Sequence, residues 1–154
     1  MLDLNKIPWG NGAITKKDWI ILSDFVNKNN INSVIEYGYG VSTMLFSETV
    51  DMVTTYESDN YYFNLGKRNG FNIIKWKADS YLPEHHADFV FIDGLAGGQN
   101  REWSFKNAAL QGKYIAAHDA SRPTEKLWME RHLNDYIMIR SGSLSIFERA
   151  GAEC

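Results

Sequence analysis

Acidic side chains follow, or end, five short apolar runs of the sequence. They are Glu36, Glu57, Asp79, Asp93 and Asp119. The runs are rich in β-branched and aromatic residues, which favours buried strands. If these strands are parallel, their carboxyl ends meet at one edge of a sheet and the five carboxylates lie along that edge. Any one of them could cap a helix or sit in a solvated turn. Because like charges repel one another, however, five together predict a polar ligand site.

The segment Ser33–Phe46 reads S-V-I-E-Y-G-Y-G-V-S-T-M-L-F and predicts a strand, a glycine turn and a helix. Gly38 and Gly40 would let bare backbone approach a ligand that any side chain would obstruct. The helix that starts at Ser42 and Thr43 would offer unpaired N–H groups to the same ligand. The acidic residue just before the turn suits a ligand that carries a positively charged amine.

Two further positions suit a nucleoside. Glu57 lies roughly 20 residues beyond the glycine turn, where an acidic residue is expected to bind ribose. Its carboxylate can accept hydrogen bonds from two hydroxyl groups. Asp79 and Ser80 follow the third predicted strand and could hold an adenine edge.

Asp93, His118 and Asp119 follow the fourth and fifth predicted strands, which we expect to be neighbours. Their side chains are therefore expected to converge. Two carboxylates and an imidazole suit a divalent metal ion, or acid–base catalysis. Asp93, like Glu36, could also meet a ligand amine. The alternative for His118 is a structural histidine whose hydrogen bonds are satisfied.

Local patterns predict the elements that position these residues. Strands are expected over 32–37, 52–56, 71–76, 88–92, 113–117, 136–139 and 144–148. Helices are expected from the cap Thr15 to Asn29, and over 41–50, 60–68, 101–110 and 124–133. The first five strands alternate with helices and should be parallel, whereas the last two form a tight antiparallel hairpin. The expected architecture is a three-layer, doubly wound α/β fold with a seven-stranded, mostly parallel sheet.

The length of 154 residues suits one domain with a substantial core. Residues 1–14, which contain Pro8 and two glycines, read as an N-terminal loop that could serve as a lid. Residues 15–149 form the expected domain, and 150–154 form a C-terminal tail.

The composition excludes several classes of function. A net charge of −3 argues against a large nucleic-acid-binding face, so we expect no nucleic-acid partner. The one cysteine, Cys154, allows no disulfide framework, which favours a cytoplasmic protein. We expect no membrane association, because no uninterrupted apolar run is long enough to cross a bilayer.

The ordered motifs E-Y-G-Y-G-V-S-T, Y-E-S-D, K-A-D-S, D-F-V-F-I-D-G and A-A-H-D resemble those of the class I S-adenosylmethionine-dependent methyltransferases. The resemblance extends from about Thr15 to Glu148, and the ordered set is more specific than the glycine motif alone. It implies a Rossmann-like methyltransferase fold, with a pattern most similar to small-molecule and sugar O-methyltransferases.

The resemblance also implies roles for individual residues. Those that would bind S-adenosylmethionine are Glu36, Gly38, Tyr39, Gly40, Ser42, Thr43, Glu57, Ser58, Asp79, Ser80 and Asp93. Asp93 and Asp119 would bind Mg²⁺, and His118 would act as a ligand or a base. The sequence departs from the family at Tyr39, where small residues are common, and at 95–98, which lack the usual histidine.

The sequence therefore predicts methyl transfer to a hydroxyl group of a small molecule or a sugar. His118 or Asp119 would remove the proton of the acceptor, or a metal ion would lower its pKa. Two alternatives are a non-catalytic cofactor-binding module and an NAD-dependent oxidoreductase, although the third glycine of the dinucleotide motif is missing. Few residues are free to form a substrate cap. The site is thus expected to be open, completed by a second subunit of a homo-oligomer, or suited to a large substrate.

Overall fold

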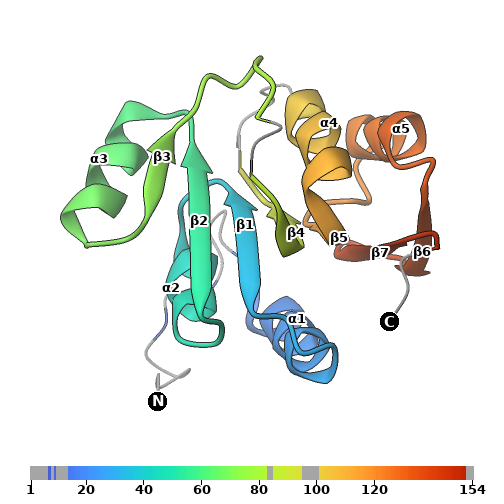
Figure 1. Cartoon of the computed structure of the whole chain (residues 1–154), viewed down its shortest axis with the longest axis horizontal. Helices are drawn as coiled ribbons and strands as arrows, with labels where there is room; N and C mark the ends of the chain where they lie inside the picture. Colours follow the sequence, from blue (N-terminus) through green and yellow to red (C-terminus); the bar gives the residue numbers. More distant parts are fainter. Residues whose placement is uncertain (1–6, 8, 10–13, 83–84, 95–100, 152–154) are drawn as a thin grey trace.

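The computed structural model describes residues 7, 9, 14–82, 85–94 and 101–151 of the chain. The helices are α1 (Lys16–Lys28), α2 (Val41–Ser47), α3 (Asn60–Arg68), α4 (Glu102–Gln111) and α5 (Pro123–His132). The strands are β1 (Ser33–Tyr37), β2 (Met52–Glu57), β3 (Ile73–Lys75), β4 (Ala87–Ile92), β5 (Gly112–Ala117), β6 (Tyr136–Arg140) and β7 (Ser145–Arg149). Figure 1 shows these elements in one sheet with flanking helices. The predicted fold class is confirmed.

Two elements are shorter than the sequence predicts by three residues each. α2 ends at Ser47 rather than at 50. The next two N–H groups, of Glu48 and Thr49, donate to carbonyls three residues back, at 3.3 and 2.9 Å, so the chain tightens into a turn. β3 has three residues instead of six, since it lies at the edge of the sheet and pairs only with β2.

The strand order in the sheet is β3-β2-β1-β4-β5-β7-β6. The first five strands are parallel, and β7 runs antiparallel between β5 and β6, as predicted. The order reverses between β1 and β4, which are neighbours although two strands separate them in the chain. In such sheets, ligands bind beyond the carboxyl ends of the strands at this switch point.

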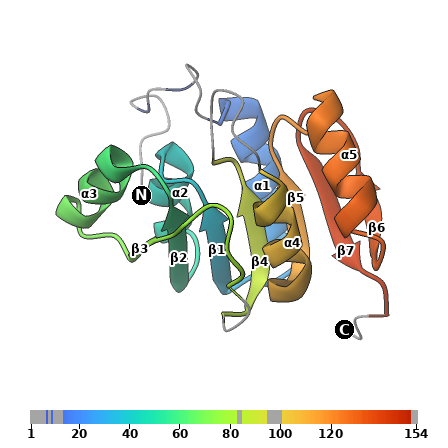
Figure 2. The ribbon, with the colours of Figure 1, turned by 90° about the horizontal axis from the view of Figure 1, so that it is seen from above.

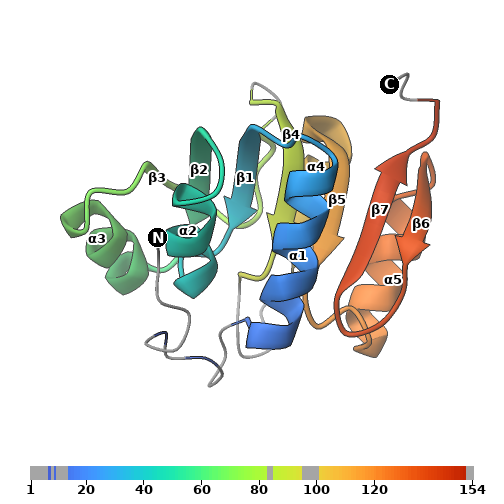
Figure 3. The same cartoon turned by 90° about the horizontal axis from the view of Figure 1, so that it is seen from below.

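The two faces of the sheet carry separate hydrophobic clusters. Alternate residues of the central strands point to opposite faces, so that Val34 packs on one face and Ile35 on the other. Figures 2 and 3 show α1 and α2 covering the first face and α4 and α5 covering the second. Phe46 and Phe105 are the largest fully buried helical side chains of the two layers. This double cover explains the continuous apolar run of β4.

Side-chain caps hold the starts of two helices at the carboxyl edge of the sheet. The Thr15 hydroxyl accepts a hydrogen bond from the Asp18 N–H at 3.1 Å, and Asp59 accepts two from the first turn of α3. These interactions place the first turn of α1 beside the predicted site. No helix in the described part of the chain is long and apolar enough to cross a membrane.

The irregular connection from β3 to β4 is anchored by two amide side chains of α4. Asn107 Oδ1 accepts from the Leu82 N–H at 2.9 Å, and its Nδ2 donates to the Ser80 carbonyl at 2.9 Å. Gln111 Nε2 donates to the Leu82 carbonyl at 2.7 Å. Residues 83–84 of this connection lie outside the described part of the chain.

The predicted division of the chain is only partly covered by the structure. Within the proposed N-terminal lid, Ile7 is buried and Trp9 packs against the α1 side of the core. Residues 1–6, 8 and 10–13 lie outside the described residues, as do 95–100 and the tail residues 152–154. The lid and the tail therefore stay predictions.

Candidate functional site

The carboxyl ends of β1 and β4 touch through two glycines. A Cβ atom added to Gly38 would lie 2.3 Å from the Cα of Gly94, and Gly38 has a φ of +103°. A Cβ on Gly94 would lie 2.6 Å from the carbonyl oxygen of Tyr37. Since both approaches are shorter than any real Cβ contact, the fold itself requires glycine at these two positions.

Gly40 is different, because the fold does not require it. Its φ of −170° is extended and open to any residue. A Cβ atom there would have nothing within 4 Å among the described residues. Gly40 is also the N-cap of α2, next to the free N–H groups of the first turn. A ligand that lies against this turn would account for the missing side chain.

Glu36 does not lie on the exposed edge where the sequence placed it, because its exposed fraction is 0%. It is the fourth of the five residues of β1, and its side chain points under α2 rather than beyond the strand. Its carboxyl group accepts hydrogen bonds from the hydroxyls of Ser42, of Thr43 at 2.5 Å and of Thr55 at 3.0 Å. Ser42 and Thr43 therefore point inward, so a cofactor contact from them would have to come from the backbone.

Burial raises the pKa of Glu36 to about 8. The three hydroxyl donors lower this pKa, and the negative charge of Asp93 raises it further. The side chain is consequently protonated and neutral near pH 7. It acts as an uncharged hydrogen-bonding centre that joins β1, β2 and the start of α2.

Replacing Glu36 with glutamine is expected to change how stability depends on pH. The folded wild type holds the proton up to about pH 8, whereas the unfolded chain releases it near 4.5. Between these values the folded state binds more protons, so the wild type loses stability as the pH rises. Glutamine cannot titrate. From the lower to the upper end of this pH window, the free energy of unfolding of Glu36→Gln should therefore increase relative to that of the wild type by roughly 2–5 kcal/mol.

Urea unfolding at pH 5 and pH 8 measures this difference. Glu48→Gln, at the exposed C-cap of α2, is the matched control and should follow the wild type. A pH dependence that is the same in Glu36→Gln and in the wild type would show that Glu36 does not retain its proton in the folded state.

Glu57 connects the turns that follow β1 and β2. Its Oε2 accepts from the Tyr39 N–H at 2.9 Å, and its Oε1 accepts from the Asp59 N–H at 2.7 Å. Each carboxylate oxygen keeps a second lone pair, so two ribose hydroxyls could still be bound. The Tyr39 ring points aside: it packs on Phe71, and its hydroxyl accepts from Asn69 at 2.9 Å.

Asp79 and Ser80 lie in an exposed turn. The Asp79 carboxylate pairs with Lys77 at 3.4 Å. The Ser80 hydroxyl donates to the Lys77 carbonyl at 2.6 Å. Neither residue lines the cleft beside Glu57, although Trp76, which does line it, donates from Nε1 to the Ser80 carbonyl at 3.3 Å. The proposed contact of Asp79 and Ser80 with adenine stays a prediction.

A narrow cleft lies at the switch point, between the ends of β1, β2 and β4. Its walls are formed by Tyr37, Gly38, Tyr56, Glu57, Ser58, Trp76 and Gly94. Three predicted cofactor-binding residues, Gly38, Glu57 and Ser58, are therefore brought together. The walls leave no space as wide as a water molecule. A nucleoside would have to widen the cleft in order to enter.

Asp93, His118 and Asp119 converge as predicted. One ligand atom from each lies within 4.8 Å of the others. Asp93 Oδ1 is 2.8 Å from His118 Nδ1, and Asp119 Oδ1 is 3.9 Å from the same nitrogen. The carboxyl ends of two neighbouring strands, β4 and β5, place the three side chains together.

A third carboxylate, that of Asp18, lies beside His118, although the sequence analysis did not assign it to the site. Asp18 Oδ2 is 3.5 Å from His118 Nε2 and accepts a hydrogen bond from the Thr15 hydroxyl at 2.7 Å. A signal was present: the first turn of a helix that leads into β1 must lie at the carboxyl edge of the sheet.

Opposing effects act on the pKa of His118. Burial lowers it, but the hydrogen bond to Asp93 and the charges of Asp93, Asp119 and Asp18 outweigh burial and leave the pKa raised above 6.5. The imidazole is therefore oriented at Nδ1 by one carboxylate and made more basic by all three. This arrangement is typical of a histidine that takes up a proton.

Arg101, which is 2% exposed, holds the ends of β4 and β5 together. Its guanidinium donates to the His118 carbonyl at 3.2 Å and to the Asp93 carbonyl at 3.3 Å. It also pairs with Asp119 at 3.5 Å and with the buried Glu125 at 3.8 Å. The sequence pattern did not reveal this role, because Arg101 reads as an ordinary residue at the start of a helix.

The donor groups of this cluster fit Mg²⁺ poorly. Mg²⁺ prefers an octahedral set of oxygen ligands, whereas one of the three donors here is the imidazole nitrogen of His118. The carboxylate of Asp119 already pairs with Arg122 at 2.8 Å and with Arg101 at 3.5 Å. A metal ion at this cluster would therefore have to share the Asp119 carboxylate with two arginines.

The sequence matches no protein-family model and no curated protein. Solved structures do resemble the chain. A candidate caffeoyl-CoA O-methyltransferase from Staphylococcus aureus superposes with a TM-score of 0.71 at 16% identity, covering 96% of this chain and 88% of that one. An O-methyltransferase from Bacillus cereus, solved with S-adenosylhomocysteine, gives 0.65 at 16% identity, covering 91% and 84%.

A third similar structure is the O-methyltransferase TomG from Streptomyces achromogenes, solved with S-adenosylmethionine. It has a TM-score of 0.58 at 12% identity and covers 96% of this chain and 85% of TomG. Each of the three resemblances covers at least 91% of this chain. The chain has the Rossmann-like fold of S-adenosylmethionine-dependent methyltransferases.

Proposed function

We propose that the protein transfers a methyl group from S-adenosylmethionine to a hydroxyl group of a small molecule or a sugar. The observation that carries the proposal is the 2.8 Å hydrogen bond between Asp93 and His118. It orients a base of raised pKa at the edge of the sheet that also forms the glycine cleft. The fold shared with solved O-methyltransferases also supports the proposed methyl transfer.

The cofactor would bind along the switch point. Gly40 and the first N–H groups of α2 would lie against its methionine part, and Glu57 would accept hydrogen bonds from the ribose hydroxyls. Asp93, beside the cleft, would face its amine. Asp79 and Ser80 would hold the adenine edge. When bound, the cofactor supplies a methyl carbon made electrophilic by the adjoining sulfonium.

His118 would act as the general base. Its neutral Nε2 would take the proton of the acceptor hydroxyl while its Nδ1–H donates to Asp93. The acceptor oxygen forms a bond to the methyl carbon as the bond from that carbon to sulfur breaks. Asp18, Asp93 and Asp119 would stabilise the imidazolium that results. Much of the rate enhancement would come from holding oxygen and methyl carbon in line.

Binding of S-adenosylhomocysteine, measured by isothermal titration calorimetry, tests the cofactor assignment. Wild type should bind it and should give no heat with NAD. Gly40→Ala should keep the wild-type melting temperature, because the new Cβ meets no described atom. The variant should bind S-adenosylhomocysteine about tenfold more weakly, since the alanine side chain occupies space that the ligand would fill.

The possible results distinguish the methyltransferase proposal from the non-catalytic alternative. If wild type does not bind S-adenosylhomocysteine, the methyltransferase proposal fails. If wild type and Gly40→Ala bind it equally, the ligand does not lie against this turn. Binding without turnover on any hydroxylated acceptor would favour the non-catalytic module.

A further inference from the structure

The strand β6 forms an apolar edge of the sheet. It is the last strand in the sheet order, so no other strand of the described chain pairs with its outer N–H and C=O groups. Three successive side chains, those of Ile137, Met138 and Ile139, are 60, 49 and 47% exposed. An apolar edge of this kind can pair with another strand, and proteins usually place charges on it or cover it.

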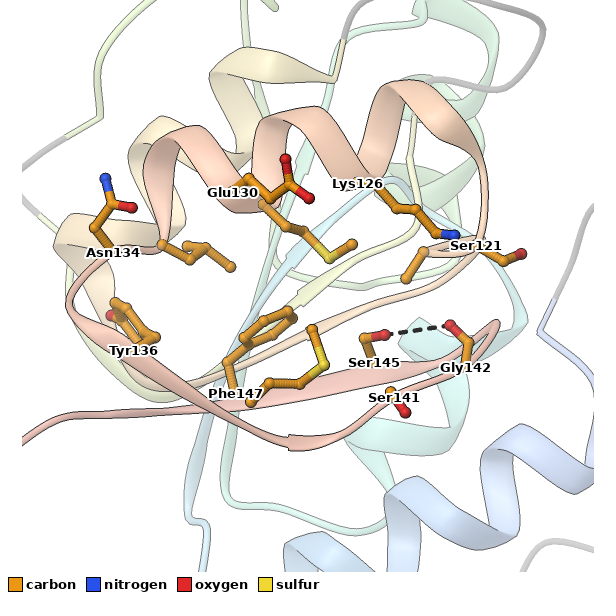
Figure 4. A pocket seen from close by; sticks show the side chains of 13 residues that line it. Ser121, Lys126, Glu130, Asn134, Tyr136, Ser141, Gly142, Ser145 and Phe147 are labelled. Carbon is orange, nitrogen blue, oxygen red and sulfur yellow. Dashed lines mark hydrogen bonds between the residues drawn. The ribbon is translucent and has the colours of Figure 1, made fainter.

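Both faces of β6 offer apolar contacts. Tyr136 and Met138 point toward α5 and line a groove of about 640 Å³, the α5 groove, between α5 and the β6–β7 hairpin (Figure 4). Ile137 points to the opposite face of the sheet. Figure 3 shows no helix of the described chain in front of β6 on that face. A partner that continues the sheet would therefore bury apolar surface on both faces at once.

The two ends of β6 carry charges of opposite sign. Asp135 directly precedes the strand and Arg140 ends it, and both are exposed. Neither forms an ion pair within the described part of the chain. When a strand lies antiparallel beside an identical strand, the start of each lies next to the end of the other. Asp135 of one copy would then lie near Arg140 of the other, twice in one interface, so this edge is complementary to itself.

We propose that two copies of this chain associate through β6, which pairs antiparallel with its counterpart about a two-fold axis at Ile137. The register of β6 against β7 shifts between Met138 and Arg140, so residues 136–138 are the regular part of the strand and contain the axis. Ile137 would lie opposite Ile137 of the second copy, and Tyr136 opposite Met138. The second copy would thus continue the sheet and close the open side of the α5 groove.

Ile137→Lys tests the position of the axis. The variant takes one isoleucine of each copy out of the interface and brings two like charges together, so it should weaken association at least about 100-fold. The fold should be kept, because Ile137 is 60% exposed and the new side chain would lie beside Glu148 of β7. Met52→Lys is the matched control, since Met52 is 56% exposed and begins β2, four strands away from β6 in the sheet order.

Sedimentation equilibrium over a range of protein concentrations measures the association, with a reducing agent present because the chain contains Cys154. The wild type and Met52→Lys should reach twice the mass of the single chain. Ile137→Lys should keep the mass of the single chain over the same concentrations. The far-ultraviolet circular dichroism spectra of the three proteins should coincide, because the variant loses the interface and not the fold.

An exchange of charges tests the antiparallel orientation. Asp135→Arg alone, or Arg140→Asp alone, would bring like charges together across the interface and should weaken association by about tenfold. The double variant, Asp135→Arg with Arg140→Asp, restores opposite charges and should associate as the wild type does. Damage to the fold by the two substitutions would instead accumulate in the double variant.

Three results would overturn the β6 interface. A wild type that stays monomeric at every concentration would leave the α5 groove to another occupant. Association that survives Ile137→Lys would show that the copies meet at a different surface. A double charge variant that associates more weakly than either single variant would exclude the antiparallel pairing. Because none of these measurements requires a cofactor, failure of the proposed methyl transfer would leave the interface untouched.

Discussion

Replacing His118 with glutamine is expected to lower methyl transfer by about 10²–10⁴-fold, the usual contribution of a general base. Glutamine keeps a polar side chain between Asp93 and Asp18 but cannot take up a proton. The affinity for S-adenosylhomocysteine should be unchanged, because His118 does not line the cleft. Release of S-adenosylhomocysteine over time, with saturating acceptor, measures the turnover.

His132→Gln is the matched control. Its Nε2 bonds to Glu102 at 2.9 Å on the helical layer away from the base, so turnover should remain at the wild-type level. In the wild type, turnover should rise with pH around a midpoint above 6.5, because the base must be neutral and the nearby carboxylates raise the pKa of His118. Addition of Mg²⁺ or of a chelator should change the turnover rate of the wild type little. Near-normal turnover of His118→Gln would contradict the role as a base.

Replacing Arg101 with methionine is expected to cost about 3–5 kcal/mol of unfolding free energy, the usual loss when one partner of a buried ion pair is removed. Glu125, which is 4% exposed, would lose its buried cation, and the carbonyls of Asp93 and His118 would lose their donors. The ends of β4 and β5 would also separate more easily, so turnover should fall as well.

Arg122→Met is the control, because Arg122 pairs with the same carboxylates of Asp119 and Glu125 at 2.8 and 3.9 Å. Its side chain is 51% exposed, so water screens these pairs and the change should cost only about 0–1 kcal/mol. Urea unfolding of the two variants and the wild type measures both losses. Equal losses would mean that burial of Arg101 does not make its ion pairs costly to break.

Much of this protein could be predicted from the sequence, because the signals were local. The apolar runs before Asp93 and Asp119 identified buried strands, since a strand covered on both faces needs apolar side chains at every position. The alternation of strands and helices then predicted the parallel sheet. Convergence of Asp93 and His118 followed from topology alone, because neighbouring parallel strands end at the same edge.

Side-chain direction and long-range contact were decided by the tertiary structure. Glu36 was predicted at an exposed edge, yet hydroxyls from α2 and β2 enclose it, and no local pattern shows which way a residue near a strand end will turn. Helix packing brought Asp18, in the first turn of α1, and Arg101, the N-cap of α4, next to His118.

The sequence by itself thus determined the order of the elements, the glycine turn and the edge at which chemistry is expected, since each of these depends on residues adjacent in the chain. The tertiary structure alone decided that Glu36 is buried, that Arg101 joins β4 to β5 and that a groove opens beside α5. These features depend on distances between segments far apart in sequence. Close packing of whole layers sets those distances, and no local pattern encodes it.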